Sequence, residues 1–296
     1  MSHENLVPVM ASSTFPSPPP RLVISDIDGT FLDDAGNLPP INREALELCR
    51  HLHVPVCLAT GRRWTTCSKL LDRLQLHHLI DFCILNNGML IRSVPDQKIL
   101  FQREFPLALA LKAIEALNLI GIDPVLLGHN QDGLTKDVFY RREDLLNGDF
   151  IAKNLDHVQK ISYWKSLQEA HLVEIILIGK KPELEKAAQA LSKVDLEVVI
   201  LRNSFYSEYM LEATPKDISK FQGAEQLLSH LHLNLTDAIA IGDSDNDYTL
   251  LKNIPRSFMV SNGVAHLKEI VTEVTKSNNE GGFGEMVFKV FKVFKV

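Results

Sequence analysis

The 296-residue chain has no run of about 18 consecutive apolar residues, so no membrane-spanning helix is expected. It has only four cysteines, all within the first third, and none forms a CxxC pair. A disulfide framework is therefore not expected, and reduced thiols in a cytoplasmic protein are the favoured interpretation. The chain also lacks an excess of basic residues, since its net charge is -6. Binding to nucleic acid or to an anionic membrane is accordingly disfavoured.

Both ends of the chain lack the periodicity of a packed element. The segment Ser12–Pro20 is rich in Ser and Pro, so a disordered tail is expected at residues 1–20. These residues have neither the basic nor the apolar region of a secretory signal, so such a signal is disfavoured. At the other end, Val287–Val296 repeats Phe-Lys-Val, a period of three that fits neither a helix nor a strand. We expect this segment to be a fraying tail.

Short apolar runs bounded by turn residues predict the buried strands of a parallel sheet. These runs are Leu22–Ser25, Val56–Ala59, Phe82–Leu85, Ala238–Ile241 and Phe258–Val260. Amphipathic helical patterns follow several of them, at 41–52 and 64–76, with shorter candidates at 246–252 and 265–271. Alternation of strand and helix predicts an α/β fold with a doubly wound, Rossmann-like parallel sheet.

The middle of the chain has a different pattern. Pro106–Leu119 predicts a helix, Val173–Ile178 and Leu196–Leu201 predict strands on either side of a helix at Pro182–Ser192, and 128–159 is polar and irregular. This stretch predicts a separate α+β unit inserted into the sheet domain. The expected organisation is a tail at 1–20, the sheet domain in two parts at 21–103 and 208–296, and the insert at 104–207.

Four of the predicted strands are followed directly by glycines and polar side chains. In an open α/β sheet the carboxyl ends of the strands form the edge at which ligands bind. The four segments are Asp26-Ile27-Asp28-Gly29-Thr30, Thr60-Gly61-Arg62, Asn86-Asn87-Gly88 and Gly242-Asp243-Ser244-Asp245-Asn246-Asp247. Each motif is weak alone, and their agreement on one edge predicts a single site.

Asp26 and Asp28 are two positions apart, so their side chains point to the same side at a strand end. Two carboxylates this close repel each other unless a cation lies between them or one holds a proton. An ionised Asp can attack phosphorus and a protonated Asp can protonate a leaving oxygen, so the pair suits phosphoryl transfer. A solvated turn is the alternative interpretation of this motif.

Three other groups could complete such a site. The loop that holds Asp243, Asn246 and Asp247 offers oxygen ligands of the kind that magnesium prefers, although it could instead be a turn that caps the next helix. Thr60-Gly61 offers a hydroxyl and a backbone N–H to a phosphate oxygen, or a simple helix cap. A lysine at 216 or 220 could neutralise phosphoryl charge, although most lysines are only solvated.

Together these segments resemble the haloacid dehalogenase (HAD) superfamily of phosphohydrolases. DIDGT at 26–30, Thr60 in ATGR, Lys220 in TPKDISK and GDSDND at 242–247 resemble its four motifs in the family's order. NNG at 86–88, VSNGVAHLKE at 260–269 and SNNEGG at 277–282 resemble the Cof-like branch, which carries a type IIB cap. The resemblance covers about residues 21–286.

The resemblance implies a role for each matching residue. Asp26 would be the nucleophile and Asp28 the general acid and then base. Thr60, Gly61, Lys220 and Asn246 would hold the phosphoryl oxygens. Mg²⁺ would be bound by Asp243, with the Asp26 carboxylate and the Asp28 carbonyl, and Asp247 would ligate it or orient its water. The insert would be the cap domain that sets specificity.

The expected activity is magnesium-dependent hydrolysis of a small phosphorylated metabolite through an aspartyl-phosphate. Sugar phosphates, pyridoxal phosphate and flavin mononucleotide are all substrates that fit the branch. Two alternatives remain open: a sugar phosphomutase that uses the same intermediate, and a non-enzymatic phosphoacceptor module. The sequence carries no signal for the oligomeric state.

Overall fold

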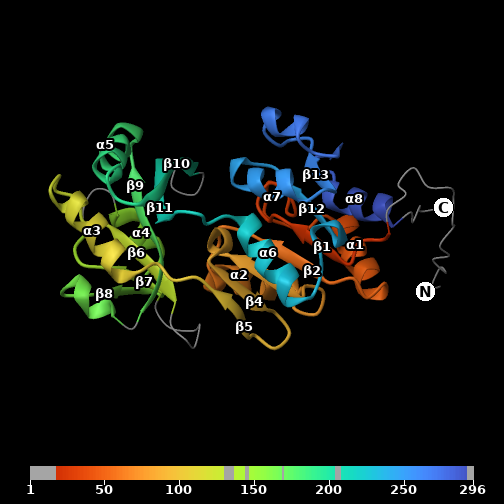
Figure 1. The fold of residues 1–296 in the computed structure, drawn as a ribbon, viewed down its shortest axis with the longest axis horizontal. Coiled ribbons are helices and arrows are strands. Elements are labelled where there is room, and N and C mark those ends of the chain that lie inside the picture. The colour runs from red at the N-terminus through yellow and green to blue at the C-terminus, as the bar shows by residue number, and fades with distance from the viewer. Residues whose placement is uncertain (1–17, 130–136, 144–146, 169, 204–207, 292–296) are drawn as a thin grey trace. The chain divides into compact units, whose positions relative to one another are not determined.

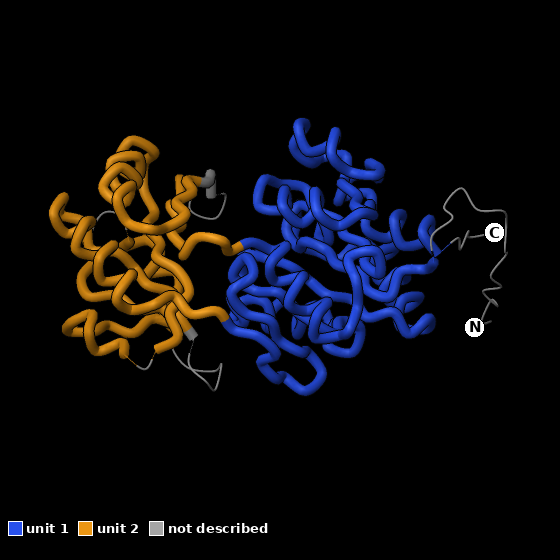
Figure 2. The backbone as a smooth tube through the Cα atoms, in the orientation of Figure 1, with its two compact units in different colours: residues 1–102, 219–296 blue, residues 103–218 orange. Residues whose placement is uncertain are grey.

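The computed structural model describes residues 18–129, 137–143, 147–168, 170–203 and 208–291 (Figure 1). The chain divides into two compact units (Figure 2). Unit 1 joins residues 1–102 to 219–296, and unit 2 is the continuous segment 103–218. Most of the expected tail at 1–20 lies outside the described residues, and so does the end of the chain from 292 onward. Among the described helices, none combines the length and apolar character needed to cross a bilayer.

Unit 1 is built on an eight-stranded, mainly parallel sheet. Its strands lie in the order β14-β13-β12-β1-β2-β3-β4-β5. The first six are parallel and the last two are antiparallel additions. In sheet order the strands are β14 (Glu273–Thr275), β13 (Ser257–Val260), β12 (Ala238–Gly242), β1 (Leu22–Ser25), β2 (Val56–Ala59), β3 (Phe82–Leu85), β4 (Leu90–Ser93) and β5 (Ile99–Gln102).

Helices cover both faces of this sheet, as in a doubly wound fold (Figure 1). Successive residues of a strand face opposite sides, so Val23 packs in one apolar cluster while Leu22 and Ile24 pack in the other. The first cluster includes residues of α1 (Pro40–His51), α2 (Trp64–Leu74) and α8 (Gly282–Val290). The second includes residues of α6 (Lys220–His230) and α7 (Tyr248–Asn253). Burial on both faces explains why the sequences of these strands are continuous runs of apolar residues.

Two expectations about unit 1 are wrong. The C-terminal repeat does not begin as a fraying tail, because Met286 and Val287 of α8 are fully buried against the sheet. A glycine-rich turn directs α8 back over the core, and its apolar face includes the first residues of the repeat. The predicted helix at 265–271 is a 3₁₀ turn, η5 (Ala265–Glu269), in which only Leu267 is buried.

Unit 2 contains a six-stranded, mixed sheet in the order β10-β11-β9-β6-β7-β8. The strands are β6 (Val125–His129), β7 (Val138–Tyr140), β8 (Val158–Lys160), β9 (His171–Gly179), β10 (Leu196–Asn203) and β11 (Glu208–Pro215), with helices α3 (Leu107–Asn118), α4 (Gly148–Lys153) and α5 (Lys181–Leu191). The stretch 128–159 is predicted to be irregular, yet its described part contributes the end of β6, β7, α4 and most of β8. These elements are too short for a periodicity to show in the sequence. Residues 130–136 and 144–146 of this stretch lie outside the described residues.

The second boundary of unit 2 differs from the expected one. The sequence placed the return to the sheet domain at 208, whereas unit 2 continues to 218. The reason is β11, which pairs along its length with β10 and also with β9. Residues 208–215 therefore belong to the sheet of unit 2, and unit 1 resumes just before α6.

Candidate active site

Polar residues from four segments converge at one edge of the unit 1 sheet. Asp26 follows β1, Thr60 follows β2 and Asp243 follows β12, and these three strands are parallel neighbours. Lys220 begins α6, which packs on one face of the sheet. The sequence predicted this edge because the carboxyl ends of parallel strands lie together.

The ammonium group of Lys220 lies at the centre of the arrangement. Its side chain is fully buried, and its Nζ donates to Asp26 Oδ1 at 2.6 Å, Asp247 Oδ1 at 2.7 Å and Asn246 Oδ1 at 3.2 Å. Burial opposes the charge of Lys220, but Asp247 and Asp26 outweigh it and raise the pKa of the lysine. Lys220 is therefore a fixed positive charge. Lys216, the other candidate, pairs instead with Asp195 in unit 2 at 2.9 Å.

Three carboxylates gather beside Lys220. Each of Asp26, Asp243 and Asp247 offers an oxygen that lies within 4.8 Å of the others. Burial raises the pKa of Asp26 well above its ordinary value, with Lys220 opposing the shift and the neighbouring carboxylates adding to it. Burial and Asp247 likewise raise the pKa of Asp243 to about 6. Burial is the main cause of both shifts, and the mutual repulsion of the neighbouring carboxylates adds to it.

These three carboxylates fit a divalent cation. Asp26 Oδ2 is buried and has no hydrogen-bond partner, which is costly unless a ligand completes it. Carboxylate oxygens are the ligands that hard divalent cations prefer. Gly29 leaves Asp243 Oδ2 unobstructed, because a Cβ at position 29 would lie only 2.6 Å from that oxygen. A cation at this point would also relieve the mutual repulsion of the three acids.

The loop after β12 is both a turn and part of the site. Asp247 Oδ2 accepts the backbone N–H groups of Asp243 and Ser244 at 3.0 and 3.2 Å, and its Oδ1 faces Lys220. Thr30 Oγ1 donates to Asp243 Oδ1 at 2.9 Å and so links the loop to the segment after β1. Ser244 and Asp247 form a capping box around the 3₁₀ turn η4 (Asp245–Asp247), whereas α7 has no side-chain cap. The turn interpretation therefore holds for η4 rather than for the helix, and the magnesium interpretation stays a prediction.

The Asp28 carboxylate lies outside the group of three. Its side chain is 53% exposed and makes a two-point ion pair with Arg62, whose Nε and Nη2 donate to Asp28 Oδ2 and Oδ1 at 2.7 and 2.5 Å. The hydrogen bonds to Asp28 raise the pKa of Arg62, so the guanidinium stays charged. Any part that Asp28 takes in holding a cation would thus come from its backbone carbonyl rather than from this carboxylate.

The remaining predicted residues lie in the loops of the same edge. Thr60 is buried, and its Oγ1 accepts the backbone N–H of Arg62 at 3.1 Å. A Cβ on Gly61 would lie 3.2 Å from Asn87 Oδ1, so glycine lets this loop approach the NNG turn closely. Asn246 uses its side-chain oxygen for both Lys220 and Ser244.

Sequence reasoning missed two side chains at this edge. Thr30 lies in the DIDGT motif and Arg62 in the ATGR motif, but the sequence predicted no role for either side chain. Spacing alone could not show that Thr30 contacts Asp243, from which it is 213 positions distant. The sequence did carry a signal for Arg62. This arginine lies two residues after Thr60, just beyond the end of β2, and β2 is the neighbour of β1, which Asp28 follows.

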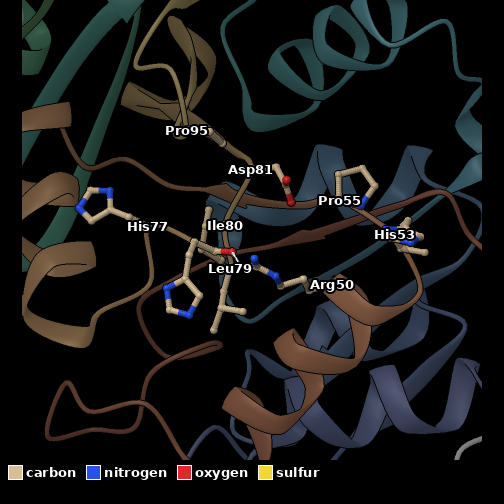
Figure 3. A pocket seen from close by; sticks show the side chains of 10 residues that line it. Arg50, His53, Pro55, His77, Leu79, Ile80, Asp81 and Pro95 are labelled. Atoms are coloured by element: carbon tan, nitrogen blue, oxygen red, sulfur yellow. Dashed lines mark hydrogen bonds between the residues drawn. The ribbon is translucent and has the colours of Figure 1, made fainter.

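A cavity of about 510 Å³ lies elsewhere in unit 1 (Figure 3). It is lined by Arg50, His53, Val54, Pro55, His77, His78, Leu79, Ile80, Asp81 and Pro95. Pro55 and Asp81 directly precede β2 and β3, so the cavity is at the amino ends of these parallel strands. The predicted site residues follow the opposite ends, and none of them lines the cavity.

Comparison with known proteins accounts for the arrangement. Residues 23–287 match the model of the haloacid dehalogenase-like hydrolases. The chain belongs to this family. The resemblance to its Cof-like branch with a type IIB cap, and the α/β core with a separate α+β unit, are thereby confirmed. So is the expectation that the chain is an enzyme that hydrolyses its substrate.

Relatives span nearly the whole of this hydrolase. It is 25% identical to a Streptococcus pyogenes protein whose name provisionally assigns it as a phosphatase, over 91% of this chain and 97% of that protein. It is 21% identical to 5-amino-6-(5-phospho-D-ribitylamino)uracil phosphatase of Bacillus subtilis, over 93% and 98%. A haloacid dehalogenase-like hydrolase from Bacteroides thetaiotaomicron superposes with a TM-score of 0.76 at 19% identity, covering 91% of this chain and 99% of that one. A subclass IIB sugar phosphatase superposes with a TM-score of 0.72 at 18% identity, covering 93% and 100%.

Proposed function

We propose that this hydrolase is a phosphatase of small phosphorylated metabolites and that Asp26 carries the phosphoryl group. The observation that supports it is the environment of Asp26. One of its oxygens is held by the fixed charge of Lys220 at 2.6 Å, and the other is buried without a hydrogen-bond partner. Such a carboxylate is oriented by one oxygen and available to react through the other.

In the first step, an Asp26 oxygen attacks phosphorus and the bond from phosphorus to the ester oxygen breaks. Asp28 gives its proton to the departing oxygen, so that a neutral alcohol leaves. Lys220, Thr60, Gly61 and Asn246 would bind the phosphoryl oxygens. The lysine is already charged in the free protein, so no proton has to be gained before it stabilises the charge on these oxygens.

In the second step, water hydrolyses the aspartyl-phosphate. Asp28, now a carboxylate, takes a proton from the water as its oxygen attacks phosphorus. The bond between phosphorus and Asp26 breaks, inorganic phosphate leaves, and both carboxyl groups return to their starting forms.

The cation that we propose is Mg²⁺, held by Asp26, Asp243 and Asp247 with the Asp28 carbonyl. When bound, it would neutralise charge on the transferring phosphoryl oxygens. Magnesium suits the set because it prefers carboxylate oxygens and binds through few protein ligands together with substrate phosphate.

The specificity of the reaction is proposed to come from unit 2. The relatives named above include a 5-amino-6-(5-phospho-D-ribitylamino)uracil phosphatase and a sugar phosphatase. A panel of sugar phosphates, pyridoxal phosphate and flavin mononucleotide, assayed for released phosphate, would identify the substrate class. An isomerised sugar phosphate in place of inorganic phosphate would point to the mutase alternative.

The cytoplasm is the proposed location. The four cysteines Cys49, Cys57, Cys67 and Cys83 are free and buried, which suits a reducing compartment. Cys67 and Cys83 share a hydrogen bond between sulfur atoms 3.7 Å apart and form no disulfide.

Asp26→Asn tests the assignment of the nucleophile. We expect loss of all steady-state phosphate release, because an amide cannot form the phosphorylated intermediate, while the similar size of Asn preserves the fold. The measurement is phosphate release on the panel with Mg²⁺, beside thermal unfolding of the same sample. Asp96→Asn, which changes an exposed carboxylate of unit 1, is the matched control and should retain full activity. Activity that survives in folded Asp26→Asn would overturn the proposal.

A further inference from the structure

Arg62 contacts Asp28 in the way that best fixes a carboxylate. Two different nitrogens of its guanidinium donate to the two different oxygens of Asp28. This two-point geometry sets the plane and the direction of the carboxylate as well as its distance, which a lysine cannot do. The side chain of Arg62 is 24% exposed, so water competes only partly for its hydrogen bonds.

The backbone of Arg62 is held as firmly as its side chain. Its N–H donates to Thr60 Oγ1 at 3.1 Å, and its carbonyl accepts the N–H of Asn86 at 3.1 Å. Asn87 N–H donates to the Thr60 carbonyl at 3.0 Å, so the loop after β2 is tied to the turn after β3 at two points. The guanidinium therefore reaches Asp28 from a loop that neighbouring strands keep in place.

The two-point contact fixes the direction of both Asp28 oxygens, because each of them accepts a hydrogen bond from a different nitrogen of Arg62. A general base must present an oxygen to the attacking water in a defined direction. The contact therefore supplies the geometry that the second half of the reaction needs, when Asp28 takes a proton from water.

We infer that Arg62 is a positioning residue that orients the Asp28 carboxylate for hydrolysis of the phosphorylated Asp26. This inference rests on the proposed function and adds to it the residue that acts through Asp28. In this step the water O–H bond breaks and its proton goes to Asp28, the water oxygen bonds to phosphorus, and the bond from phosphorus to Asp26 breaks. Arg62 keeps its own protons and charge throughout.

The inference predicts which kinetic parameter changes in Arg62→Ala. With p-nitrophenyl phosphate the leaving group is a weak base and departs without a proton, so phosphorylation of Asp26 needs Asp28 little. The ratio kcat/KM reports only steps up to the departure of the leaving group, while kcat includes hydrolysis of the intermediate. We expect kcat to fall by about 10- to 100-fold, which is part of what a well-placed general base contributes, with kcat/KM nearly unchanged.

A second readout follows the intermediate directly. Samples quenched in acid during turnover should contain more phosphorylated Asp26 in Arg62→Ala than in the wild type, because its breakdown is slowed. Arg62→Lys restores the charge but not the two-point contact, so its kcat should lie between those of the other two. Arg43→Ala is the matched control, because it removes a guanidinium that donates to the Leu74 carbonyl at 2.7 Å rather than to a carboxylate of the site, and its kinetics should match the wild type.

Other outcomes would overturn the inference. A fall in kcat/KM equal to that in kcat, or a rise in KM alone, would show that Arg62 acts in folding or substrate binding. Unchanged kinetics in both Arg62 variants would show that the pair is only a surface contact. These results leave the proposed function intact as long as Asp26→Asn is inactive, so the two failures can be told apart.

Discussion

Lys220 shows how one buried side chain can organise a catalytic edge. A lysine enclosed by apolar residues would lose its proton, but three oxygen acceptors around its Nζ stabilise the charge. Asp26 and Asp247 each accept a hydrogen bond from it at Oδ1, while Asp26 Oδ2 is buried without a hydrogen-bond partner. One buried ammonium group thus joins three of the residues that the proposed reaction uses.

Asp243 carries a prediction for the dependence of stability on pH. Its pKa in the folded protein is about 6, above its ordinary value of 3.8, so the folded state holds a proton that the unfolded state has released. Stability from this carboxyl is complete below the lower value and is lost as the pH rises through about 6. Without divalent cations, we expect the free energy of unfolding of the wild type, relative to Asp243→Asn, to fall between pH 4 and 7.

Urea unfolding in a chelating buffer would measure this difference at each pH. Added Mg²⁺ at pH 7 should raise the unfolding midpoint of the wild type more than that of Asp243→Asn, because the cation stabilises the ionised carboxylate. A difference that grows with pH in the absence of cations would contradict the assignment of the shift to Asp243.

At the scale of elements, the central strands of unit 1 could be predicted from the sequence, because full burial requires continuous runs of apolar residues. β1, β2 and β3 match the predicted runs, since a strand covered on both faces must be apolar throughout. β4, β5 and β14 lie at or near the margins of the sheet and were not predicted, because their residues are more mixed. The α8 helix was missed since its Phe-Lys-Val repeat does not show the helical period.

The candidate site divides in the same way. Asp26, Asp243 and Lys220 could be predicted because each stands next to a recognisable element end. Adjacent strand ends could place Arg62 near Asp28, but their two-point contact could not be predicted, since it depends on side-chain directions in two loops. The contact of Thr30 with Asp243 likewise exists only in three dimensions.

The start of α6 depends on a close approach by the turn after β3. Gly88 has φ +113°, and a Cβ on it would lie 2.2 Å from the Ser219 carbonyl, beside Lys220. Gly88→Ala should lower stability by about 1–3 kcal/mol, through strain and overlap, and should reduce activity by displacing Lys220.

Thermal unfolding and phosphate release would test this pair of effects. The matched control is Gly148→Ala, where a Cβ would meet nothing within 4 Å and the change should stay within about 0.5 kcal/mol. Equal stability of the two variants would show that the approach between Gly88 and Ser219 can relax at no cost.

At the scale of the whole molecule, unit 2 is one continuous segment with its own sheet. Its buried residues include Ile175, Leu177 and Leu211 from adjacent strands and Leu184 from α5. A segment with a closed set of strand pairings and its own apolar core should fold alone. We expect the fragment 103–218 to unfold in one cooperative transition in urea, as followed by circular dichroism, whereas residues 1–102 alone should not.

Absence of a cooperative transition in the fragment would show that unit 2 needs unit 1. The N-terminal fragment is the natural comparison because it includes β1 without β12, its partner on one side. A stable fold in 1–102 would contradict the view that the central strands need both parts of unit 1.

The position of β1 between β2 and β12 has a consequence for how the protein is made. A ribosome delivers the strand that bears Asp26 early, and then the whole of unit 2, before it delivers Lys220 and Asp243. The nascent chain thus holds its proposed nucleophile without the lysine that contacts it or the acids that would bind a cation with it. We therefore expect a product that stops before α6 to be inactive, and hydrolysis to begin only when synthesis has passed β12.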